Sequence, residues 1–431
     1  MDKMTSLMKE LEILEAKSEN INVGVVGAGR MGTGLIIQMA KIKGLRVSAV
    51  SDLYLERATS AIQGAQPLQK IITTNDLDEA EDAVKNGSII ATQNSSILPQ
   101  LPDLNVIVDA TGSPEVGAEI AHESINNGKC VVMLNAEADA TIGPILNHYA
   151  TTSGVVYTGA SGDEPGAAKE LYDFAATLGF RIIAAGKGKN NPLDRNATPI
   201  TLEKVAKQKG LDPKMLTSFV DGTKTMVEMT QLANATGLKP DIRGMHGPEA
   251  SVAKLSSLFC AKSDGGILVS EGAVDFAVGS VAPGVFVVFK TTEKIIRNDL
   301  DYLGLGPGPY YHLYRPYHLC HIETPLSIAR AAIQKEPSIA PIDGPVAEVI
   351  TIAKRDLKRG EKMDGIGGVT VFGLIERANI AKQIGALPIG LAGRATLRKD
   401  LARGEVIGLN DVELPDNQLT RLRREQDRYF T

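Results

Sequence analysis

The stretch Ile21-Asn-Val-Gly-Val-Val-Gly-Ala-Gly-Arg-Met-Gly-Thr-Gly34 decides the fold of the first part of this chain. Its β-branched beginning predicts a strand, and an apolar, helical-looking stretch follows the glycines over residues 35–40. A strand, a glycine turn and a helix N-terminus in this order are typical of a dinucleotide-binding loop. In such a loop Gly27 allows the tight turn, Gly29 lets the backbone approach a pyrophosphate, and Gly32 lets the helix pack close to the strand.

An acidic residue stands at the spacing at which such folds bind ribose hydroxyls. The second predicted strand, residues 46–50, is followed by Ser51 and Asp52, about twenty residues beyond the glycines. Asp52 favours NAD because its charge would repel a 2′-phosphate. Arg30, inside the glycine loop, and Arg57, just beyond Asp52, could instead accommodate NADP. These residues alone leave both cofactors open.

Composition excludes several classes of function. The 431 residues predict two to four domains, and 46 basic against 51 acidic side chains give no footprint of a nucleic-acid or membrane partner. No apolar run approaches the roughly 18 residues of a membrane span. Residues 1–20 predict an amphipathic helix rather than a secretory signal, and the three scattered cysteines have no metal-binding spacing. We therefore expect a cytoplasmic protein.

Residues 21–158 alternate predicted strands and helices, which indicates a doubly wound, parallel Rossmann sheet. The polar segment 76–101 resembles an insertion in this pattern. Turns at the carboxyl ends of parallel strands line the ligand crevice. The expected cofactor-binding residues are Gly27, Gly29, Arg30, Met31, Gly32, Asp52, Arg57, Ala110, Thr111, Gly112 and Asn135. The strands are expected at 22–26, 46–50, 71–73, 106–109, 130–134 and 155–158.

Residues 159–320 no longer show the regular alternation of strands and helices, and they predict an α+β domain for substrate binding and dimerisation. A turn at 186–192 carries Lys187, Lys189 and Asn190, which could clamp a phosphate or carboxylate; two solvated lysines are the alternative. A predicted helix over 218–236 places four polar residues on one face, and a solvated charged face is the alternative there. These four are Asp221, Lys224, Thr225 and Glu228.

Three further features complete the expected organisation. The segment 304–321 is rich in tyrosine and histidine and includes His318, although an aromatic plug between domains has the same composition. A helix within 321–340 is expected to return to the first domain. Residues 341–431 predict a small β-rich unit and a tail, in which Asp-Leu-x-Arg-Gly-Glu occurs at 356–361 and again at 400–405.

These motifs occur in an order that resembles homoserine dehydrogenase over roughly residues 20–335. Residues from 345 to about 415 resemble a SAF domain, a small β-fold. The phrases Phe219-Val-Asp-Gly-Thr-Lys-Thr-Met-Val-Glu228 and Tyr314-Arg-Pro-Tyr-His-Leu319 are similar to the DXR-like group. Two departures count against homoserine oxidation itself: Asn135 is followed by Ala136 instead of lysine, and only two residues separate Asp221 from Lys224.

The resemblance implies a reductoisomerase that converts 1-deoxy-D-xylulose 5-phosphate to 2-C-methyl-D-erythritol 4-phosphate in isoprenoid biosynthesis. It also implies a weak preference for NADP(H) over NAD(H) and a requirement for Mg²⁺ or Mn²⁺, and we expect a homodimer or homotetramer. Lys224 would act as electrophile or proton donor, and Asp221 would orient it. Five carboxylates are available as general bases or metal ligands, although each is more often structural: Glu137, Asp139, Asp163, Glu164 and Glu228. The substrate would be bound by Lys187, Lys189, Asn190, Glu228 and His318.

Three functions remain open on the sequence. The first is this reductoisomerase, acting on a small anionic substrate. The second is a dehydrogenase of another small polar hydroxy acid or sugar acid on the same scaffold. The third is a non-catalytic dinucleotide sensor, in which 341–431 would be a partner-binding module.

Overall fold

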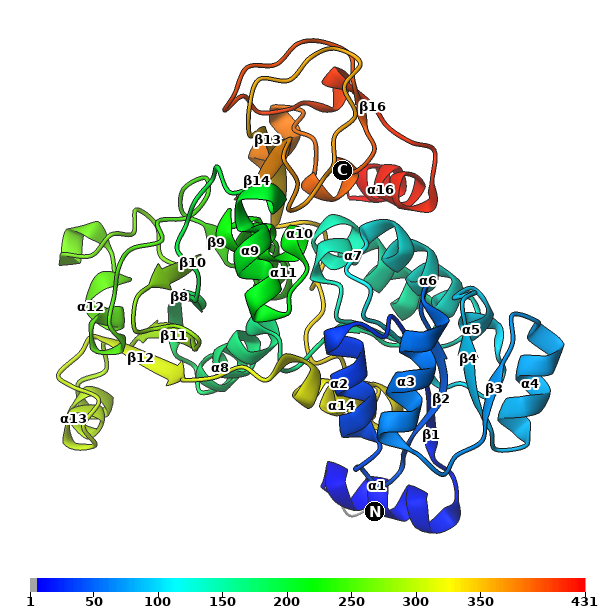
Figure 1. Ribbon diagram of the computed structural model, residues 1–431. Helices are drawn as coiled ribbons and strands as arrows, with labels where there is room; N and C mark the ends of the chain where they lie inside the picture. Colours follow the sequence, from blue (N-terminus) through cyan, green and yellow to red (C-terminus); the bar gives the residue numbers. More distant parts are fainter. Residues whose placement is uncertain (1–5, 431) are drawn as a thin grey trace. The chain divides into compact units, whose positions relative to one another are not determined.

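The computed structural model describes residues 6–430, and the chain divides into two compact units. The first unit comprises the chain up to Asp163 together with Leu319–Ala340. The second comprises Glu164–His318 and the chain from Pro341 onward. Residues 341–431, expected as a small unit of their own, therefore group with residues 164–318 (Figure 1).

A seven-stranded parallel sheet forms the centre of the first unit, which confirms the predicted doubly wound α/β fold. The strand order is β3-β4-β2-β1-β5-β6-β7. The order reverses beside β1, so the crevice where such sheets bind ligands lies at the carboxyl ends of β1 and β5. The strands are β1 (Ile21–Val26), β2 (Leu45–Ser51), β3 (Ile71–Thr73), β4 (Ile89–Thr92), β5 (Val106–Asp109), β6 (Cys130–Met133) and β7 (Tyr157–Gly159).

One strand of this sheet corrects the sequence analysis. The segment 76–101 is a regular part of the fold and not an insertion. Asp76 is the N-cap of α4 (Leu77–Lys85), and its side chain accepts a hydrogen bond from Glu79 N. The helix leads into β4. Every residue of β4 is buried between β2 and β3. The sequence did not predict α4 and β4, because α4 is polar and because a short strand inside a sheet has no clear hydrophobic periodicity.

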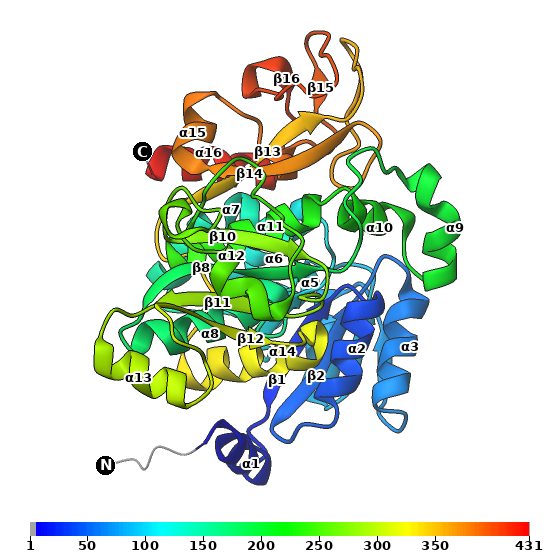
Figure 2. The same cartoon turned by 90° about the vertical axis from the view of Figure 1, so that its left-hand side faces the viewer.

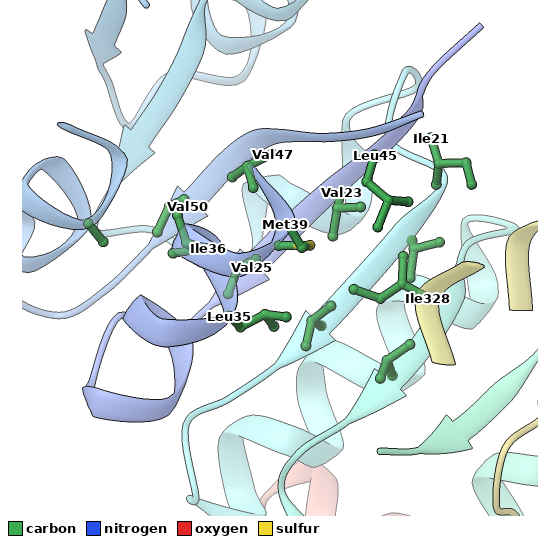
Figure 3. Packing of buried hydrophobic residues seen from close by; sticks show 14 of the residues in the cluster. Ile21, Val23, Val25, Leu35, Ile36, Met39, Leu45, Val47, Val50 and Ile328 are labelled. Atoms are coloured by element: carbon green, nitrogen blue, oxygen red, sulfur yellow. The ribbon is translucent and has the colours of Figure 1, made fainter. Parts of the chain in front are cut away.

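Apolar side chains of the strands and helices pack into one core in this unit. Figure 3 shows Val23 and Val25 of β1 against Leu35 and Met39 of α2, with Ile328 of the returning helix in the same cluster. The predicted return of the chain after residue 320 is thus part of this core. The helices of the unit are α1 (Leu7–Lys17), α2 (Arg30–Met39), α3 (Leu55–Ala65), α4, α5 (Ile97–Gln100), α6 (Pro114–Asn126), α7 (Ala136–Thr152) and α14 (Cys320–Ala329), which a π-helical turn (Arg330–Gln334) extends.

A mixed five-stranded sheet with the order β12-β11-β8-β10-β9 forms the centre of the second unit (Figure 2). β8 is parallel to β10 and antiparallel to β11. It extends through Lys189, so Lys187 and Lys189 lie within a strand and not in the predicted turn. The strands are β8 (Arg181–Lys189), β9 (Lys239–Pro240), β10 (Ala273–Val278), β11 (Val285–Lys290) and β12 (Tyr310–Arg315).

The helix predicted over residues 218–236 is two helices. α10 (Pro213–Val220) ends at Asp221, and α11 (Thr223–Thr236) begins after Gly222. Gly222 has a φ of +83°, a left-handed conformation that interrupts the helix and that glycine adopts without strain. Asp221 therefore does not share a helix with Lys224 and Glu228. The unit also contains α8 (Glu164–Thr177), α9 (Pro199–Lys209), α12 (Leu255–Leu258) and α13 (Lys294–Tyr302).

The C-terminal segment, residues 341–431, is built on two short antiparallel strand pairs. β13 (Ala347–Ala353) pairs with β14 (Val371–Arg377), and β15 (Thr396–Leu397) pairs with β16 (Val412–Glu413). α15 (Ala378–Gln383) follows β14, and α16 (Gln418–Tyr429) closes the described chain. Within residues 6–430, no helix combines the length and the apolar character that crossing a bilayer requires.

Candidate active site

The glycine loop lies at the carboxyl end of β1, beside the end of β5. Gly27 has a φ of +97°, and a Cβ atom there would lie 2.8 Å from the carbonyl oxygen of Ala110. A Cβ atom on Gly32 would lie 1.9 Å from the carbonyl oxygen of Gly27. Among residues 6–430, apart from the two chain neighbours of Gly29, no atom would lie within 4 Å of a Cβ atom at this position. The fold therefore requires glycine at 27 and 32, whereas position 29 faces open space, as the close approach of a ligand requires.

Asp52 follows β2 and lies beside the glycine loop. Its Oδ2 accepts a hydrogen bond from Ala28 N at 2.7 Å, and its Oδ1 accepts one from Tyr54 N at 2.9 Å. These two bonds hold the carboxylate at the edge of the crevice, where the ribose hydroxyls of a dinucleotide bind in this fold. The guanidinium of Arg57 lies 4.4 Å from the ring centre of Tyr54 and is exposed.

Asp109 and Asn135 join the ends of β5 and β6. Asn135 Nδ2 donates to Asp109 Oδ2 at 2.9 Å, and Asn135 Oδ1 accepts from Ala138 N at the start of α7. Thr111 N and Oγ1 both donate to Asp109 Oδ1. Burial raises the pKa of Asp109, although these hydrogen bonds oppose the shift. This network fixes the turn 110–112 and places Asn135 next to it, at the edge where both were expected.

The other predicted residues of the first unit take varied positions. Arg30 is exposed on the first turn of α2, and Met31 beside it has a sulfur 3.2 Å from His321 Nδ1. Glu137 is buried in the first turn of α7, where its charge contributes to the raised pKa of Asp109. Asp163 is buried at the end of this unit, directly before Glu164.

A cleft of about 1070 Å³ lies at the opposite edge of the parallel sheet. It is lined by residues at the amino ends of the strands, including Ile21, Asn105 and Cys130, and by one side of α1. Because dinucleotides bind at the carboxyl ends of such strands, this cleft is not the cofactor site.

A buried charged cluster in the second unit brings together several of the predicted substrate-binding residues. Lys187 of β8 donates through Nζ to Glu164 Oε1 at 2.5 Å and to Glu228 Oε2 of α11. The three side chains are 7%, 10% and 3% exposed, respectively. His318 Nε2 lies 3.4 Å from Glu164 Oε1, and His318 Nδ1 lies 2.8 Å from the carbonyl oxygen of Pro283. We call Glu164, Lys187, Glu228 and His318 the charged cluster.

Electrostatics hold Lys187 in its charged form. Burial alone would lower the pKa of Lys187, but the adjacent Glu164 and Glu228 outweigh burial and raise it. Burial and Glu164 raise the pKa of Glu228, against the lowering effect of Lys187 and Lys224. A lysine ammonium has three N–H donors. Two bind these carboxylates, and within the described part of the chain the third has no acceptor. A substrate oxygen can accept it.

The remaining lysine and amide of the predicted anion clamp lie outside this arrangement. Lys189 Nζ donates to the carbonyl oxygens of Asn191 and Phe219, at 2.6 Å and 2.7 Å. Burial, with a contribution from Lys187, lowers the pKa of Lys189 to about 8. Asn190 is exposed. The structure therefore does not present Lys189 and Asn190 together as a phosphate clamp.

Asp221 occupies a separate buried ion pair. Its Oδ2 lies 2.9 Å from Nζ of Lys354, and its Oδ1 accepts a hydrogen bond from Thr223 N at the start of α11. Lys224, on the next residue of α11, is half-buried, and its charge acts on Glu228. Sequence reasoning did not single out Lys354, because nothing near it marks a partner 133 positions earlier.

The resemblance to reductoisomerases implies a divalent metal, and Glu164 and Glu228 offer oxygens within 4.8 Å of each other. Oxygen ligands of this kind suit Mg²⁺. In this arrangement, however, the ammonium of Lys187 lies between the two carboxylates, at the place that a metal ion would take. These two residues therefore do not fit a metal ion as arranged. Glu164 had been named only as one available carboxylate; its place directly before a predicted helix gave no stronger signal.

The segment that contains this cluster is similar to a known catalytic domain. Residues 162–324 match the family model described as "Oxidoreductase DRL, catalytic domain", and this range contains the whole charged cluster. An inositol 2-dehydrogenase from Arthrobacter sp. (strain FB24) is 39% identical over 75 residues, which are 17% of this chain and 20% of that protein. The alignment thus spans about a fifth of that relative's length.

Several solved structures of dehydrogenases match this chain at low identity. A probable dehydrogenase from Thermotoga maritima is 12% identical, with a TM-score of 0.41 over 75% of this chain and 90% of that one. A scyllo-inositol dehydrogenase from Lactobacillus casei, with bound NAD(H) and scyllo-inositol, is 15% identical, with a TM-score of 0.35 over 63% and 74%. Identities and TM-scores this low do not indicate which reaction the protein catalyses.

The dinucleotide-binding fold of the first unit and the catalytic-domain match in the second define the class. Residues 162–324 match an oxidoreductase catalytic domain, and the first unit has the sheet order and glycine loop of a dinucleotide-binding domain. More narrowly, the model that it matches is that of the DRL oxidoreductases, over residues 162–324 of 431.

Proposed function

We propose that this protein is an NAD(H)-dependent dehydrogenase that oxidises a secondary hydroxyl group of a small polyhydroxylated substrate to a ketone. The observation that carries the proposal is the charged cluster, in which Lys187 is held charged between Glu164 and Glu228 with one donor to spare. Ammonium donors and carboxylate acceptors at one buried place suit a substrate that offers several hydroxyl groups. The match of one segment to an inositol 2-dehydrogenase supports the same substrate class.

The cluster can perform the proton chemistry of such an oxidation. When bound, a nicotinamide dinucleotide accepts the hydride that leaves the substrate carbon. The hydroxyl proton must leave as well, and Glu228, whose pKa burial raises, is suited to accept it. Lys187 would stabilise the negative charge that develops on the substrate oxygen, because a preorganised ammonium in a buried site acts strongly there. The products are the ketone, the reduced dinucleotide and a proton.

NAD(H) is the cofactor that we propose, although the resemblance leans towards NADP(H). Asp52 is held by two backbone hydrogen bonds at the place where the adenosine ribose binds in this fold. A carboxylate fixed there repels a 2′-phosphate. Arg57 is exposed and lies against Tyr54.

The second candidate is the reductoisomerase reaction on 1-deoxy-D-xylulose 5-phosphate, which the DRL catalytic-domain match favours. We rank it second because two carboxylates oppose a phosphate at the charged cluster, and because Lys189 donates to backbone carbonyls. The SAF resemblance of residues 341–431 and the likeness to homoserine dehydrogenase stay predictions.

One assay separates the two candidates. The purified protein is incubated with NAD⁺ or NADP⁺ and myo-inositol, scyllo-inositol or D-gluconate, and the appearance of reduced dinucleotide is followed by absorbance. In parallel, NADPH consumption is followed with 1-deoxy-D-xylulose 5-phosphate and Mn²⁺. Reduction of NAD⁺ by a polyol supports the dehydrogenase. Turnover of the phosphorylated ketose alone overturns it in favour of the reductoisomerase, and dinucleotide binding without any turnover overturns both.

A lysine variant ties the activity to the charged cluster. We expect Lys187→Met to lower kcat at least about hundredfold, as loss of a charge-stabilising donor does in other enzymes. Lys290→Met is the matched control, since Lys290 lies in the same sheet and donates to Tyr310 and Glu271 outside the cluster. Wild-type kcat in Lys187→Met would contradict the assigned role.

A further inference from the structure

The C-terminal segment, residues 341–431, binds α11 at both of its ends. At the first turn, Gly373 N donates to Thr223 Oγ1 at 2.9 Å. At the last turn, Val346 N and Ala347 N donate to Asn234 Oδ1 at 2.8 Å and 3.0 Å. β13 and β14 pack against the helix between these ends. The helix that carries Lys224 and Glu228 is therefore seated on a segment more than 100 residues later in the chain.

Lys354, directly after β13, makes the strongest of these connections. Its side chain is 3% exposed, and its Nζ donates to Asp221 Oδ2, to the carbonyl oxygen of Ala197 and to that of Gly368, each at 2.9 Å. These bonds use all three ammonium hydrogens. Because all three hydrogens are bonded and the ammonium is buried, the group is held in one position.

Asp221 connects the ammonium of Lys354 to the start of α11. Its side chain is fully buried, and its Oδ1 accepts a hydrogen bond from Thr223 N, the first residue of the helix. Its backbone oxygen accepts one from Arg195 Nη1 at 2.8 Å. Removal of either partner of a buried ion pair leaves an uncompensated charge, which the surroundings must rearrange to solvate. The first turn of α11 is where such a rearrangement would occur.

The first turn of α11 determines where the side chain of Glu228 lies, together with that of Lys224, whose charge acts on Glu228. Lys224 is the second residue of the helix, and Glu228, one turn later, binds Lys187. Misplacement of catalytic groups by about 1 Å can lower a rate by about two orders of magnitude. The ion pair is thus well placed to affect the reaction without touching the substrate.

We propose that Lys354 is a positioning residue: through its ion pair with Asp221, the C-terminal segment holds the first turn of α11, and with it Lys224 and Glu228, in the geometry that the charged cluster needs. The catalytic consequence rests on the proposed function. The placement of α11 does not.

The experiment compares four variants of the full chain. Lys354→Met removes the charge and keeps the length of the side chain, and Lys354→Arg keeps the charge. The double variant Lys354→Met/Asp221→Asn removes both charges, so no buried charge is left unpaired. Lys358→Met is the control, because Lys358 lies in the same segment but pairs with Asp400 in solvent, with side chains 76% and 60% exposed.

Three quantities are measured for each variant: kcat and KM on the substrate that the wild type accepts, the melting temperature, and amide hydrogen exchange over residues 222–229. For Lys354→Met we expect kcat to fall at least about tenfold, while KM for the dinucleotide stays within about twofold. We also expect faster exchange in the first turn of α11. The double variant should regain melting temperature but keep the lowered kcat, and Lys354→Arg should regain part of kcat. Lys358→Met should match the wild type.

The outcomes distinguish this proposal from the proposed function. Wild-type kcat and wild-type exchange in the double variant would overturn the positioning role, because the helix would then keep its place without the ion pair. A fall in melting temperature that the double variant fully repairs, together with kcat, would reduce Lys354 to a structural residue and would also overturn it. If the wild type turns over none of the substrates, the proposed function fails, and the exchange of residues 222–229 by itself decides whether Lys354 holds α11.

Discussion

Two glycines of the dinucleotide loop should respond in opposite ways to the same substitution. Gly32→Ala places a methyl group 1.9 Å from the carbonyl oxygen of Gly27. Gly29→Ala places one where, chain neighbours aside, no atom of the described residues lies within 4 Å. Gly29 precedes α2 with a φ of −70°, which alanine adopts without strain. The first change therefore acts on the fold and the second on the ligand.

The expected magnitudes follow from these distances. An ordinary contact of this kind is about 3.4 Å or more, so Gly32→Ala must move α2 away from the carbonyl group of Gly27 by more than about 1 Å. Overpacking of this kind costs roughly 1–3 kcal/mol or more, which lowers the melting temperature of a unit of this size by at least several degrees, about 2–4 °C for each kcal/mol. Gly29→Ala should change stability by less than about 1 kcal/mol, the usual range for a helix N-cap position. Its methyl group should weaken dinucleotide binding at least about tenfold, or roughly 1.4 kcal/mol.

The assay pairs thermal unfolding with titration of NADH by fluorescence for the wild type and both variants. We expect Gly29→Ala to keep its melting temperature and lose affinity, and Gly32→Ala to lose melting temperature. Wild-type affinity in Gly29→Ala would refute the placement of the pyrophosphate at this loop. Wild-type stability in Gly32→Ala would refute the close packing of α2 against β1.

Two further predictions concern charged residues. Asp52→Asn removes the charge that opposes a 2′-phosphate, so the ratio of the Kd for NADP⁺ to that for NAD⁺ should fall at least about tenfold in calorimetric titrations; an unchanged ratio would show that Asp52 does not face the ribose. Burial raises the pKa of Glu348 to about 7, although Arg423 opposes the shift. Stability from its protonated form is therefore fully present below about pH 4.5 and is lost as the pH rises through about 7. In urea unfolding, the free energy of unfolding of the wild type minus that of Glu348→Gln should fall by up to about 3 kcal/mol over this range, and a flat difference would contradict it.

Local sequence was sufficient for most of the first unit. The predicted strands at 71–73 and 106–109 coincide with β3 and β5, and the glycine loop lies at the end of β1 as expected. Each of these signals is local: a β-branched run, a glycine spacing, or a polar turn after a buried strand. β4 was missed because its four residues follow a polar helix and derive their burial from strands on both sides.

Residues 186–189 lie in β8 and not in a turn because neighbouring strands pair with them. The local sequence does not show such pairing. Gly186 and Gly188 beside Lys187 and Lys189 looked like turn glycines. In the structure a Cβ atom on Gly186 would lie 1.9 Å from the carbonyl oxygen of Asp275, and one on Gly188 would lie 2.2 Å from Ala282 N. Only glycine fits at these two positions, because adjacent segments of the chain lie too close to the strand for a side chain. The two lysines were thus correctly noticed but wrongly placed in a turn.

The repeated Asp-Leu-x-Arg-Gly-Glu motif is a second feature for which the sequence and the structure gave different information. The sequence revealed both copies, but only the structure shows that they pair. Leu357 and Leu401 exchange backbone hydrogen bonds of 2.9 Å and 3.0 Å. Asp356 accepts from the backbone of the second copy at Arg403 N, and Asp400 accepts from the first at Arg359 N, at 2.9 Å and 2.8 Å.

The sequence by itself determined the Rossmann sheet, the dinucleotide loop and the residue types available for catalysis, because each depends on neighbours within a few residues along the chain. The tertiary structure decided which of those residues work together. It brought Glu164, Lys187 and Glu228 to one buried place, and it paired Asp221 with Lys354 from 133 positions away. A buried charge must find its partner wherever the fold supplies one, and the spacing of residues along the chain does not record that choice.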